Sequence, residues 1–326
     1  MRSSLGMVAL SLLAVFAATG EADEATARTR LKELGAVITT GDNPSAAVAI
    51  NLNVSRTTDG DLGVLKEIKN IQTLLLRETP ITDSGLAELR DLSELVTLDL
   101  YHTRVSDSGL KHLSALKALQ TLNLDWTQIT DTGLLDLEEL QDLQNLNLSR
   151  TVITDEGLIH LRKLTKLVAL DVSKTKITDA GLVELKGLRN LRSLNLAFVE
   201  VTDAGLKSLS QIPSLQEIGI NSDKVTDAGI SELTGLEGLK ELSLRHAKLT
   251  QVGLKSLLKL PELESLDLAD TAVADGDVKV LEEFKKLKRL DIRRTKITEA
   301  GLRELRQALS KADLPLRVLP DRPGND

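Results

Sequence analysis

Aspartates recur at a fixed interval along this chain and are the first candidates for chemistry. They stand 24 residues apart, with one gap of 48, at Asp59, Asp83, Asp107, Asp131, Asp155, Asp179, Asp203, Asp227 and Asp275. A calcium site needs several converging oxygen ligands, whereas this column supplies one carboxylate per interval. Each aspartate directly precedes a predicted short helix, where a carboxylate can accept hydrogen bonds from free backbone N–H groups. We therefore predict helix caps and no metal site.

The sequence offers few of the residue combinations that form catalytic sites. Cysteine is absent, which excludes a thiolate nucleophile, a thiolate metal site and a disulfide framework. The histidines are His102, His112, His160 and His246. The outer two are six intervals apart, roughly 29 Å at the spacing of neighbouring strands, so they cannot share a metal ion. No nucleophile, phosphate-binding glycine loop or ligand cluster accompanies His102, and we predict a protein that is not an enzyme and needs no cofactor.

The only tyrosine and the only tryptophan lie close together in the sequence pattern. Tyr101, His102 and Trp126 are expected on two neighbouring strands of one exposed sheet face. Tyrosine and tryptophan offer a large rigid contact area with a polar handle, which favours recognition surfaces. The alternative is an aromatic pair that merely covers the sheet. The predicted ligand-binding set is Tyr101, His102, Trp126, Asp99, Asn123, Asp125 and Phe198.

The elements that position these residues follow from internal repetition. Two leucine columns run through the chain at a period of 24 without insertion, one from Leu74 to Leu290 and one from Leu65 to Leu305. Within one block, Leu98 and Leu100 alternate with polar residues, as in a strand with one buried face. The apolar residues that follow are spaced by three, which suits a short helix. Neither half can bury its leucines alone, so the blocks must stack into a solenoid with a parallel sheet on the concave side and helices on the convex side.

Three further columns are expected to be structural. Threonine hydroxyls in the turn after each strand should bond loop backbone groups, at Thr79, Thr103, Thr127, Thr151, Thr175, Thr271 and Thr295. Short polar residues between the two strand leucines, such as Asp99 and Asn123, should form a ladder from strand to strand. The glycine two residues after each aspartate should allow close approach between blocks, although Asp61 and Asp277 replace it in two of them.

The block L-x-x-L-x-L-x-x-T-x-[IV]-T-D-x-G-L-x-x-L-x-x-L-x-x resembles the leucine-rich repeat family. Its T-D-x-G-L signature, as in residues 82–86 and 178–182, looks like that of exported planctomycete-type bacterial proteins and, more distantly, of F-box adaptors. The F-box subtype usually carries a cysteine in the repeat, and this chain has none. The resemblance implies an α/β horseshoe and a binding scaffold.

The two ends of the chain differ from the repeats. Residues 1–22 contain Arg2 followed by an apolar run from Leu5 to Ala18, which predicts a cleaved signal peptide; a retained membrane anchor is the alternative. Residues 23–46 are expected to form a cap of one helix and a hairpin, and residues 47–310 about eleven repeats, the first of them degenerate. Residues 311–326 should contribute a terminating strand, with Leu314 and Leu316 in strand register around Pro315, and a polar tail.

Charge and composition narrow the function. The formal charge of -7 argues against a nucleic-acid partner, which normally needs a basic face. With only 2% aromatic residues, the core must be aliphatic. We expect an exported monomer, periplasmic or extracellular, that is not inserted in a membrane after signal cleavage and that binds a protein or glycan on its concave face. An intracellular F-box-like adaptor and a structural envelope protein without a discrete ligand are the alternatives.

Overall fold

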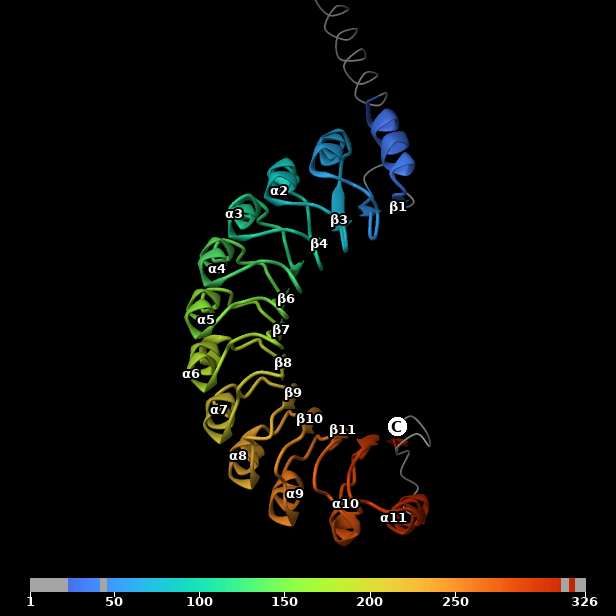
Figure 1. Ribbon diagram of the computed structural model, residues 1–326, viewed down its shortest axis with the longest axis vertical. Helices are drawn as coiled ribbons and strands as arrows, with labels where there is room; N and C mark the ends of the chain where they lie inside the picture. The colour runs from blue at the N-terminus through green and yellow to red at the C-terminus, as the bar shows by residue number, and fades with distance from the viewer. Residues whose placement is uncertain (1–22, 42–45, 312–316, 320–326) are drawn as a thin grey trace, which may run out of the picture.

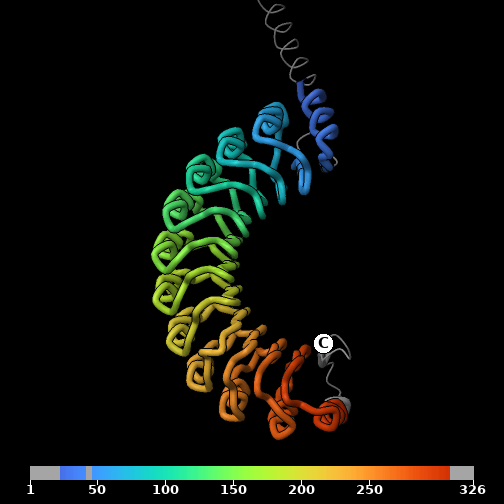
Figure 2. The backbone as a smooth tube through the Cα atoms, in the orientation of Figure 1, coloured from blue at the N-terminus to red at the C-terminus, as the bar shows by residue number. Residues whose placement is uncertain are grey.

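A computed structural model describes residues 23–41, 46–311 and 317–319. The chain winds into an open horseshoe with strands along the inner side and helices along the outer side (Figure 1). Within the described residues, thirteen strands form one sheet in chain order, β1 antiparallel to β2 and every later pair parallel. The backbone tube shows one coil after another without a break between domains (Figure 2). The predicted α/β solenoid is confirmed.

The strands are short, and most of them contain three residues. Their bounds are β1 (Val37–Thr40), β2 (Val48–Asn51), β3 (Ile71–Leu75), β4 (Thr97–Asp99), β5 (Thr121–Asn123), β6 (Asn145–Asn147), β7 (Ala169–Asp171), β8 (Ser193–Ala197), β9 (Glu217–Asn221), β10 (Glu241–Arg245), β11 (Ser265–Asp267), β12 (Arg289–Asp291) and β13 (Arg317–Leu319). From β3 to β12, partners are 24 residues apart, as in the pairing of Leu122 with Leu146. The sequence period therefore equals the strand register.

Most of the outer helices begin at the aspartate column, and several are completed by a 3-10 turn. The α-helices are α2 (Asp83–Leu89), α3 (Asp107–Leu110), α4 (Asp131–Leu137), α5 (Asp155–Leu161), α6 (Asp179–Leu182), α7 (Asp203–Leu209), α8 (Asp227–Glu232), α9 (Gln251–Leu257), α10 (Val278–Leu281) and α11 (Glu299–Lys311). The 3-10 segments are η1 (Asp59–Glu67), η2 (Leu113–Ala115), η3 (Val183–Gly187), η4 (Leu233–Gly235) and η5 (Asp275–Asp277). The tighter 3-10 turn has three residues per turn, which fits the apolar spacing of three.

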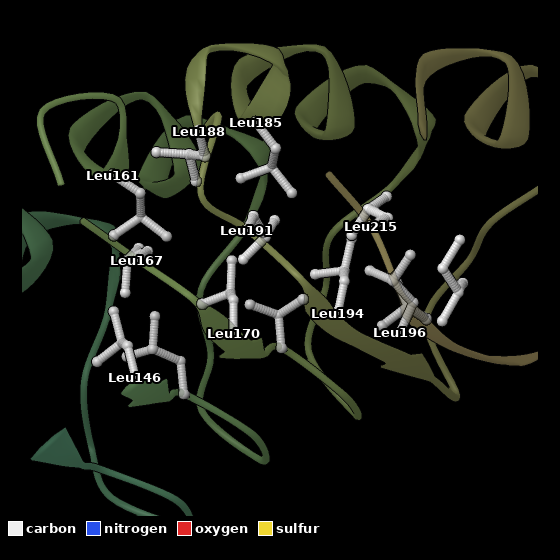
Figure 3. Packing of buried hydrophobic residues seen from close by; sticks show 14 of the residues in the cluster. Leu146, Leu161, Leu167, Leu170, Leu185, Leu188, Leu191, Leu194, Leu196 and Leu215 are labelled. Atoms are coloured by element: carbon white, nitrogen blue, oxygen red, sulfur yellow. The ribbon is translucent and has the colours of Figure 1, made fainter. Parts of the chain in front are cut away.

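Leucines from strand and helix meet between these two layers. Leu146, Leu170 and Leu194 come from successive strands and Leu161 and Leu185 from the helices opposite, and all five are at most 2% exposed. Their side chains interdigitate between the ribbon layers (Figure 3). Full burial of one leucine side chain contributes roughly 1.5–3 kcal/mol, so this aliphatic interior is the main source of stability.

The aspartate column joins neighbouring repeats, and its prediction as a helix cap was wrong. The Asp131 Oδ1 accepts from the Thr154 N–H at 2.7 Å, and the Thr154 Oγ1 donates to Asp131 Oδ2 at 2.6 Å. Thr154 itself caps α5, since its hydroxyl accepts from the Glu156 N–H at 3.3 Å. We call this pair of bonds to the residue 23 positions later the Asp–Thr staple. Within the described residues it recurs at Asp59, Asp83, Asp107, Asp131, Asp155, Asp179, Asp203, Asp227 and Asp275, with Ser106 once replacing the threonine.

The staple also explains the glycine of the T-D-x-G-L signature. A Cβ on Gly157 would lie 2.4 Å from Asp131 Oδ1 and 2.9 Å from a Leu134 methyl group. The carboxylate of one repeat thus occupies the space that a side chain of the next repeat would need. The predicted close approach between blocks is confirmed, and its cause is the staple.

One junction between described repeats lacks the staple, and three residues change together there. Gln251 stands in the aspartate column, Ala274 in the threonine position of the next repeat and Asp277 in its glycine position. Asp277 Oδ2 accepts from the Ala274 N–H at 2.9 Å, which satisfies the donor that a staple would otherwise engage. Asp61 does the same for the Thr58 N–H at the first repeat, at 2.9 Å. The glycine column is therefore needed only where a stapling aspartate precedes it.

The threonine column acts as predicted. The Thr127 Oγ1 donates to the Leu124 carbonyl at 2.6 Å, and the other threonines of the column repeat this bond three residues back. The column fails at Val199, Asp223 and Ala247, and the strands that precede these three residues, β8, β9 and β10, are each two residues longer than most. The irregular blocks thus differ in their turns and strand lengths while they keep the strand register.

The two ends of the chain differ from the repeats, and the predicted C-terminal register was wrong. A helix over residues 23–33 buries Ala27 and Leu31, and β1 pairs with β2 as a hairpin. At the other end, Leu290 pairs with Val318, which is 28 residues later, because the 13-residue helix α11 lengthens this last block. Leu314, Pro315 and Leu316 lie outside the described residues, as do the predicted signal segment 1–22 and the tail 320–326.

Candidate functional site

Three of the predicted ring side chains form one cluster beside the N-terminal half of the sheet. The rings of His102 and Trp126 stack with centroids 4.0 Å apart and planes 15° from parallel. The Tyr101 ring stands edge-on to Trp126 at 6.3 Å and tilted to His102 at 5.8 Å. Trp126 remains 49% exposed. A large aromatic surface is thus held rigidly at the protein surface.

The cluster lies in the turns after β4 and β5, and its predicted position on the strands was wrong. β4 ends at Asp99 and β5 at Asn123, two residues before Tyr101 and Asp125. His102 and Trp126 have φ angles of 53° and 58°, in the left-handed region that few residues other than glycine adopt. The left-handed turn directs both rings to the margin of the concave face, where their repeat-to-repeat spacing lets them stack.

Two arginines complete the cluster, and the sequence analysis missed them. The Arg77 guanidinium lies 4.7 Å from the Tyr101 ring centroid, and that of Arg150 lies 5.6 Å from the Trp126 centroid. Arg150 also lies 5.9 Å from the Tyr101 centroid, and its Nη1 is 3.5 Å from the tyrosine oxygen. Arg77 shares the column of Tyr101 one block earlier, and Arg150 the column of Trp126 one block later. These shared columns are the sequence signal that could have identified both arginines.

Two carboxylates face these arginines at distances beyond good hydrogen bonds. Asp99 Oδ2 lies 3.8 Å from Arg77 Nε, and Asp125 Oδ1 lies 3.5 Å from Arg150 Nε. Asp125 is only 7% exposed, and its Oδ1 has no hydrogen-bond partner among the described residues. Burial raises the pKa of the Asp99 carboxyl, opposed by the Tyr101 N–H and Arg77, and the neighbouring Asp125 charge adds to the rise. The cluster therefore holds two desolvated acceptors beside two fixed donors.

Short polar side chains at the ends of the strands line the adjacent part of the sheet. We call Asp99, Asn123, Asn147, Asp171 and Asn195 the Asx column. Each Oδ1 accepts from the backbone N–H two residues later, as from Asp125 N at 3.0 Å. The expected strand-to-strand ladder is present only locally, as between Asn195 Nδ2 and Asp171 Oδ2 at 2.8 Å. These residues mainly fix the turn that carries the cluster.

A groove of about 460 Å³ runs along this face across β4 to β8. Its floor is the Asx column together with a second column two residues earlier in each strand, formed by Thr97, Thr121, Asn145, Ala169 and Ser193. The leucines beneath, such as Leu122 and Leu146, are at most 2% exposed. The groove is thus lined mostly by short polar side chains that lie above a buried leucine layer.

Phe198 is the one predicted site residue that does not join the cluster. It lies in the same turn column as Trp126, three repeats later, and is 58% exposed. Its ring contacts the Lys174 ammonium at 5.2 Å. Six of the seven predicted residues are therefore brought together or line the adjoining groove, and Phe198 is separate.

The charged residues at the C-terminal end are already paired with one another. Arg294 Nε lies 2.7 Å from Asp270 Oδ1, and Arg245 Nη2 donates to Asp270 Oδ2 at 2.9 Å. Asp291, only 1% exposed, is held by the Arg293 guanidinium. These bonds give this end of the concave face an internally neutralised network.

The described residues form neither a metal-binding cluster nor a membrane-spanning helix. In residues 23–41, 46–311 and 317–319, no three His, Asp or Glu side chains are placed to hold a metal ion together. No helix in this part of the chain has the length and apolar character required to span a bilayer.

Comparison with known proteins settles the family. The family model described as a leucine-rich repeat region matches residues 49–311. The chain belongs to the leucine-rich repeat family. No curated protein sequence matches this leucine-rich repeat protein significantly.

Solved structures of similar fold come from bacterial leucine-rich repeat proteins. An internalin, InlF of Listeria monocytogenes, is 19% identical with a TM-score of 0.56 over 81% of this chain and 83% of its own. A Leptospira interrogans leucine-rich repeat protein is 23% identical with a TM-score of 0.59, covering 79% of this chain and 62% of its own. The functional domain of Listeria InlJ, which includes a cysteine ladder, is 19% identical with a TM-score of 0.53 over 76% and 49%. These similarities concern the fold; this chain has no cysteine, and its own recurring link between repeats is the Asp–Thr staple.

Proposed function

We propose that this leucine-rich repeat protein is an exported, non-catalytic scaffold that binds a protein or glycan through the N-terminal half of its concave face. The observation that carries the proposal is the cluster of Tyr101, His102 and Trp126 with Arg77 and Arg150. Tryptophan, tyrosine and arginine are the residue types in which binding energy concentrates. Ring stacking and cation–π contacts fix their side chains before binding, which lowers the entropy lost on association.

The position of the cluster supports a role in ligand binding rather than in stabilising the fold. Its rings are not part of the buried leucine columns, and Trp126 keeps half of its surface exposed. The groove next to it gives a ligand room to extend over five strands. A scaffold of this type does its work by contact alone, and the family consists mostly of such scaffolds.

The test is the double variant Tyr101→Ser/Trp126→Ser. Because both residues lie outside the core, the thermal melting point should change little. Capture of the ligand from a native exported fraction by the immobilised protein should weaken by at least ~2 kcal/mol, about thirtyfold in Kd. His246→Ser is the matched control, since it removes an exposed ring from the same column outside the cluster, and it should bind as the unchanged protein does.

Two outcomes would contradict the proposal. Unfolding of the double variant would mean that the rings are part of the core. Unchanged capture would place the contact surface elsewhere, or would indicate an envelope protein whose concave face is indifferent to substitution.

Export is tested separately, by sequencing the N-terminus of the protein isolated from cells. We expect a mature chain that begins within residues 19–23, after the apolar run from Leu5 to Ala18. A retained Met1 would instead favour a retained membrane anchor or the intracellular adaptor.

A further inference from the structure

The groove and the ring cluster together define the chemical class of the ligand. We propose that it is an uncharged polyhydroxylated chain, a glycan, which lies along the groove across β4 to β8 and ends against the Tyr101 cluster. This inference rests on the proposed function and narrows it to one ligand class. Three features of the described residues carry it: the unfilled hydrogen-bond groups of the cluster, the balance of charge, and the surface of the groove.

The two arginine–carboxylate pairs of the cluster are complementary to hydroxyl groups. Arg150 Nε and Asp125 Oδ1 are 3.5 Å apart, and Arg77 Nε and Asp99 Oδ2 are 3.8 Å apart, so each pair sets a donor beside an acceptor without a direct hydrogen bond. A hydroxyl both donates and accepts, so a single ligand hydroxyl can serve both members of a pair. An ammonium only donates and a carboxylate only accepts, so either leaves one member unserved.

Asp125 gives the strongest support for a hydroxyl ligand, because burial of its carboxylate is unfavourable unless a ligand or water donates to it. Only 7% of the residue is exposed, and nothing in the described part of the chain donates a hydrogen bond to its Oδ1. A buried acceptor without a hydrogen bond is unfavourable, and a donor supplied by the ligand removes that cost. The site is therefore ready to receive a hydroxyl hydrogen at this atom.

The charges around the cluster disfavour ionic ligands of either sign. Arg77 and Arg150 offset Asp99 and Asp125, and along the groove only Asp171 adds a further charge. A polyanion would approach three carboxylates, and a basic peptide would approach two guanidinium groups held on the tyrosine ring. An uncharged ligand incurs neither repulsion.

The groove itself presents hydrogen-bonding groups among exposed apolar atoms. Protein hot spots insert large side chains into well-packed pockets, whereas the leucines beneath this floor are at most 2% exposed. The floor instead presents hydroxyl and amide groups from Thr97, Thr121 and Asn145. Neighbouring strands are about 4.8 Å apart, so five strands span roughly 19 Å. One strand spacing is close to the length of one sugar unit in an extended chain, and a regular glycan would meet similar groups at successive strands.

The test is native gel electrophoresis of the full-length protein in gels that contain a polysaccharide. The uncharged probes are dextran, mannan, galactomannan, xyloglucan and mixed-linkage β-glucan, and the anionic probes are polygalacturonate and heparin. We expect at least one uncharged polymer to retard the protein and oligosaccharides of that polymer to change the fluorescence of Trp126, the only tryptophan. Binding should change less than twofold between about 0.05 and about 0.5 M NaCl, because salt screens only charged contacts.

Variants are chosen to keep the fold while they alter the hydrogen bonds. Asp125→Ser takes the residue found at this position in the next repeat, Ser149, and Asn147→Asp keeps the Oδ1 that accepts the Ser149 N–H. Each should weaken the affinity for the retarding glycan at least tenfold. Ser243→Ala is the matched control, because Ser243 occupies the same strand position as Asn147 beyond the groove, and it should change the affinity less than twofold.

The inference is overturned if no uncharged polymer retards the protein, or if retardation disappears at high salt or is equal in Asp125→Ser. If a protein partner is captured and lost in Tyr101→Ser/Trp126→Ser while the glycans fail, the proposed function stands and this inference is wrong. If the double variant captures and migrates as the unchanged protein does, the proposed function itself fails.

Discussion

Removal of one Asp–Thr staple should cost more than loss of an ordinary helix cap. Asp131→Ala deletes two hydrogen bonds to a carboxylate, at 2.7 Å from the Thr154 N–H and 2.6 Å from its hydroxyl. Hydrogen bonds to a charged group contribute about 1.5–3 kcal/mol each, but this pair is only part-buried, so the lower end applies. The Thr154 N–H also loses its partner. We expect the free energy of unfolding to fall by about 2–4 kcal/mol, against about 0.5–2 kcal/mol for a cap alone.

The assay is urea denaturation followed by circular dichroism, with and without a calcium chelator. Asp131→Asn should lose about half as much as Asp131→Ala, since its amide oxygen can still accept from the Thr154 N–H. Gln251→Ala is the matched control, because it changes the same helix position in the repeat that has no staple. It should change stability by less than ~0.5 kcal/mol, as surface substitutions usually do. The chelator should have no effect on any of these proteins, since one carboxylate per repeat is no calcium site.

A double-mutant cycle isolates the staple from other effects of the substitutions. Asp131→Ala and Thr154→Val should be coupled by at least ~1 kcal/mol, because each removes the partner of the other. Two results would refute the reasoning. One is an Asp131→Ala loss no larger than that of Gln251→Ala, and the other is additivity of the two substitutions.

Three further predictions follow from the same geometry. Introducing a staple with Gln251→Asp, Ala274→Thr and Asp277→Gly together should raise the free energy of unfolding by about 1–3 kcal/mol in urea titrations. Gln251→Asp alone should lower it, because Asp277 occupies the space the new carboxylate needs. A change of the same sign in both proteins would contradict this prediction. Deletion of the block 143–166 should leave a soluble protein with a cooperative melt, whereas deletion of its first twelve residues should not, because each repeat contacts only its neighbours; equal melts would count against the 24-residue unit. Hydrogen bonds from the Thr298 side chain and backbone lower the pKa of Asp275 below 3.8. The stabilising effect of the ionised carboxylate is therefore complete above that value and is lost as the pH falls through the folded pKa. Below about pH 4, the melting temperature of Asp275→Ala should decline less steeply with falling pH than that of the unchanged protein.

The sequence by itself determined the repeat, the register and the core. A period of 24 without insertion fixes which residues share a column, and stacked parallel strands must then pair column by column, as Leu122 does with Leu146. The N-terminal helix and hairpin were also readable, since Ala27 and Leu31 follow helical spacing. Most of the candidate site could be predicted from the sequence, because rare residue types such as the single tryptophan are easily recognised within a regular repeat.

Only the tertiary structure decided what those columns touch. Asp131 lies next to its own helix in the sequence, but stacking brings the Thr154 N–H and hydroxyl of the following repeat within reach, and that pairing depends on how two backbones meet. The ring cluster likewise depends on how neighbouring repeats stack. The left-handed turns after β4 and β5 carry His102 and Trp126, whose rings stack, and Arg77 and Arg150 from the flanking repeats lie against the Tyr101 ring. Periodicity assigns a residue to a column, whereas turn conformation and stacking decide where its side chain goes.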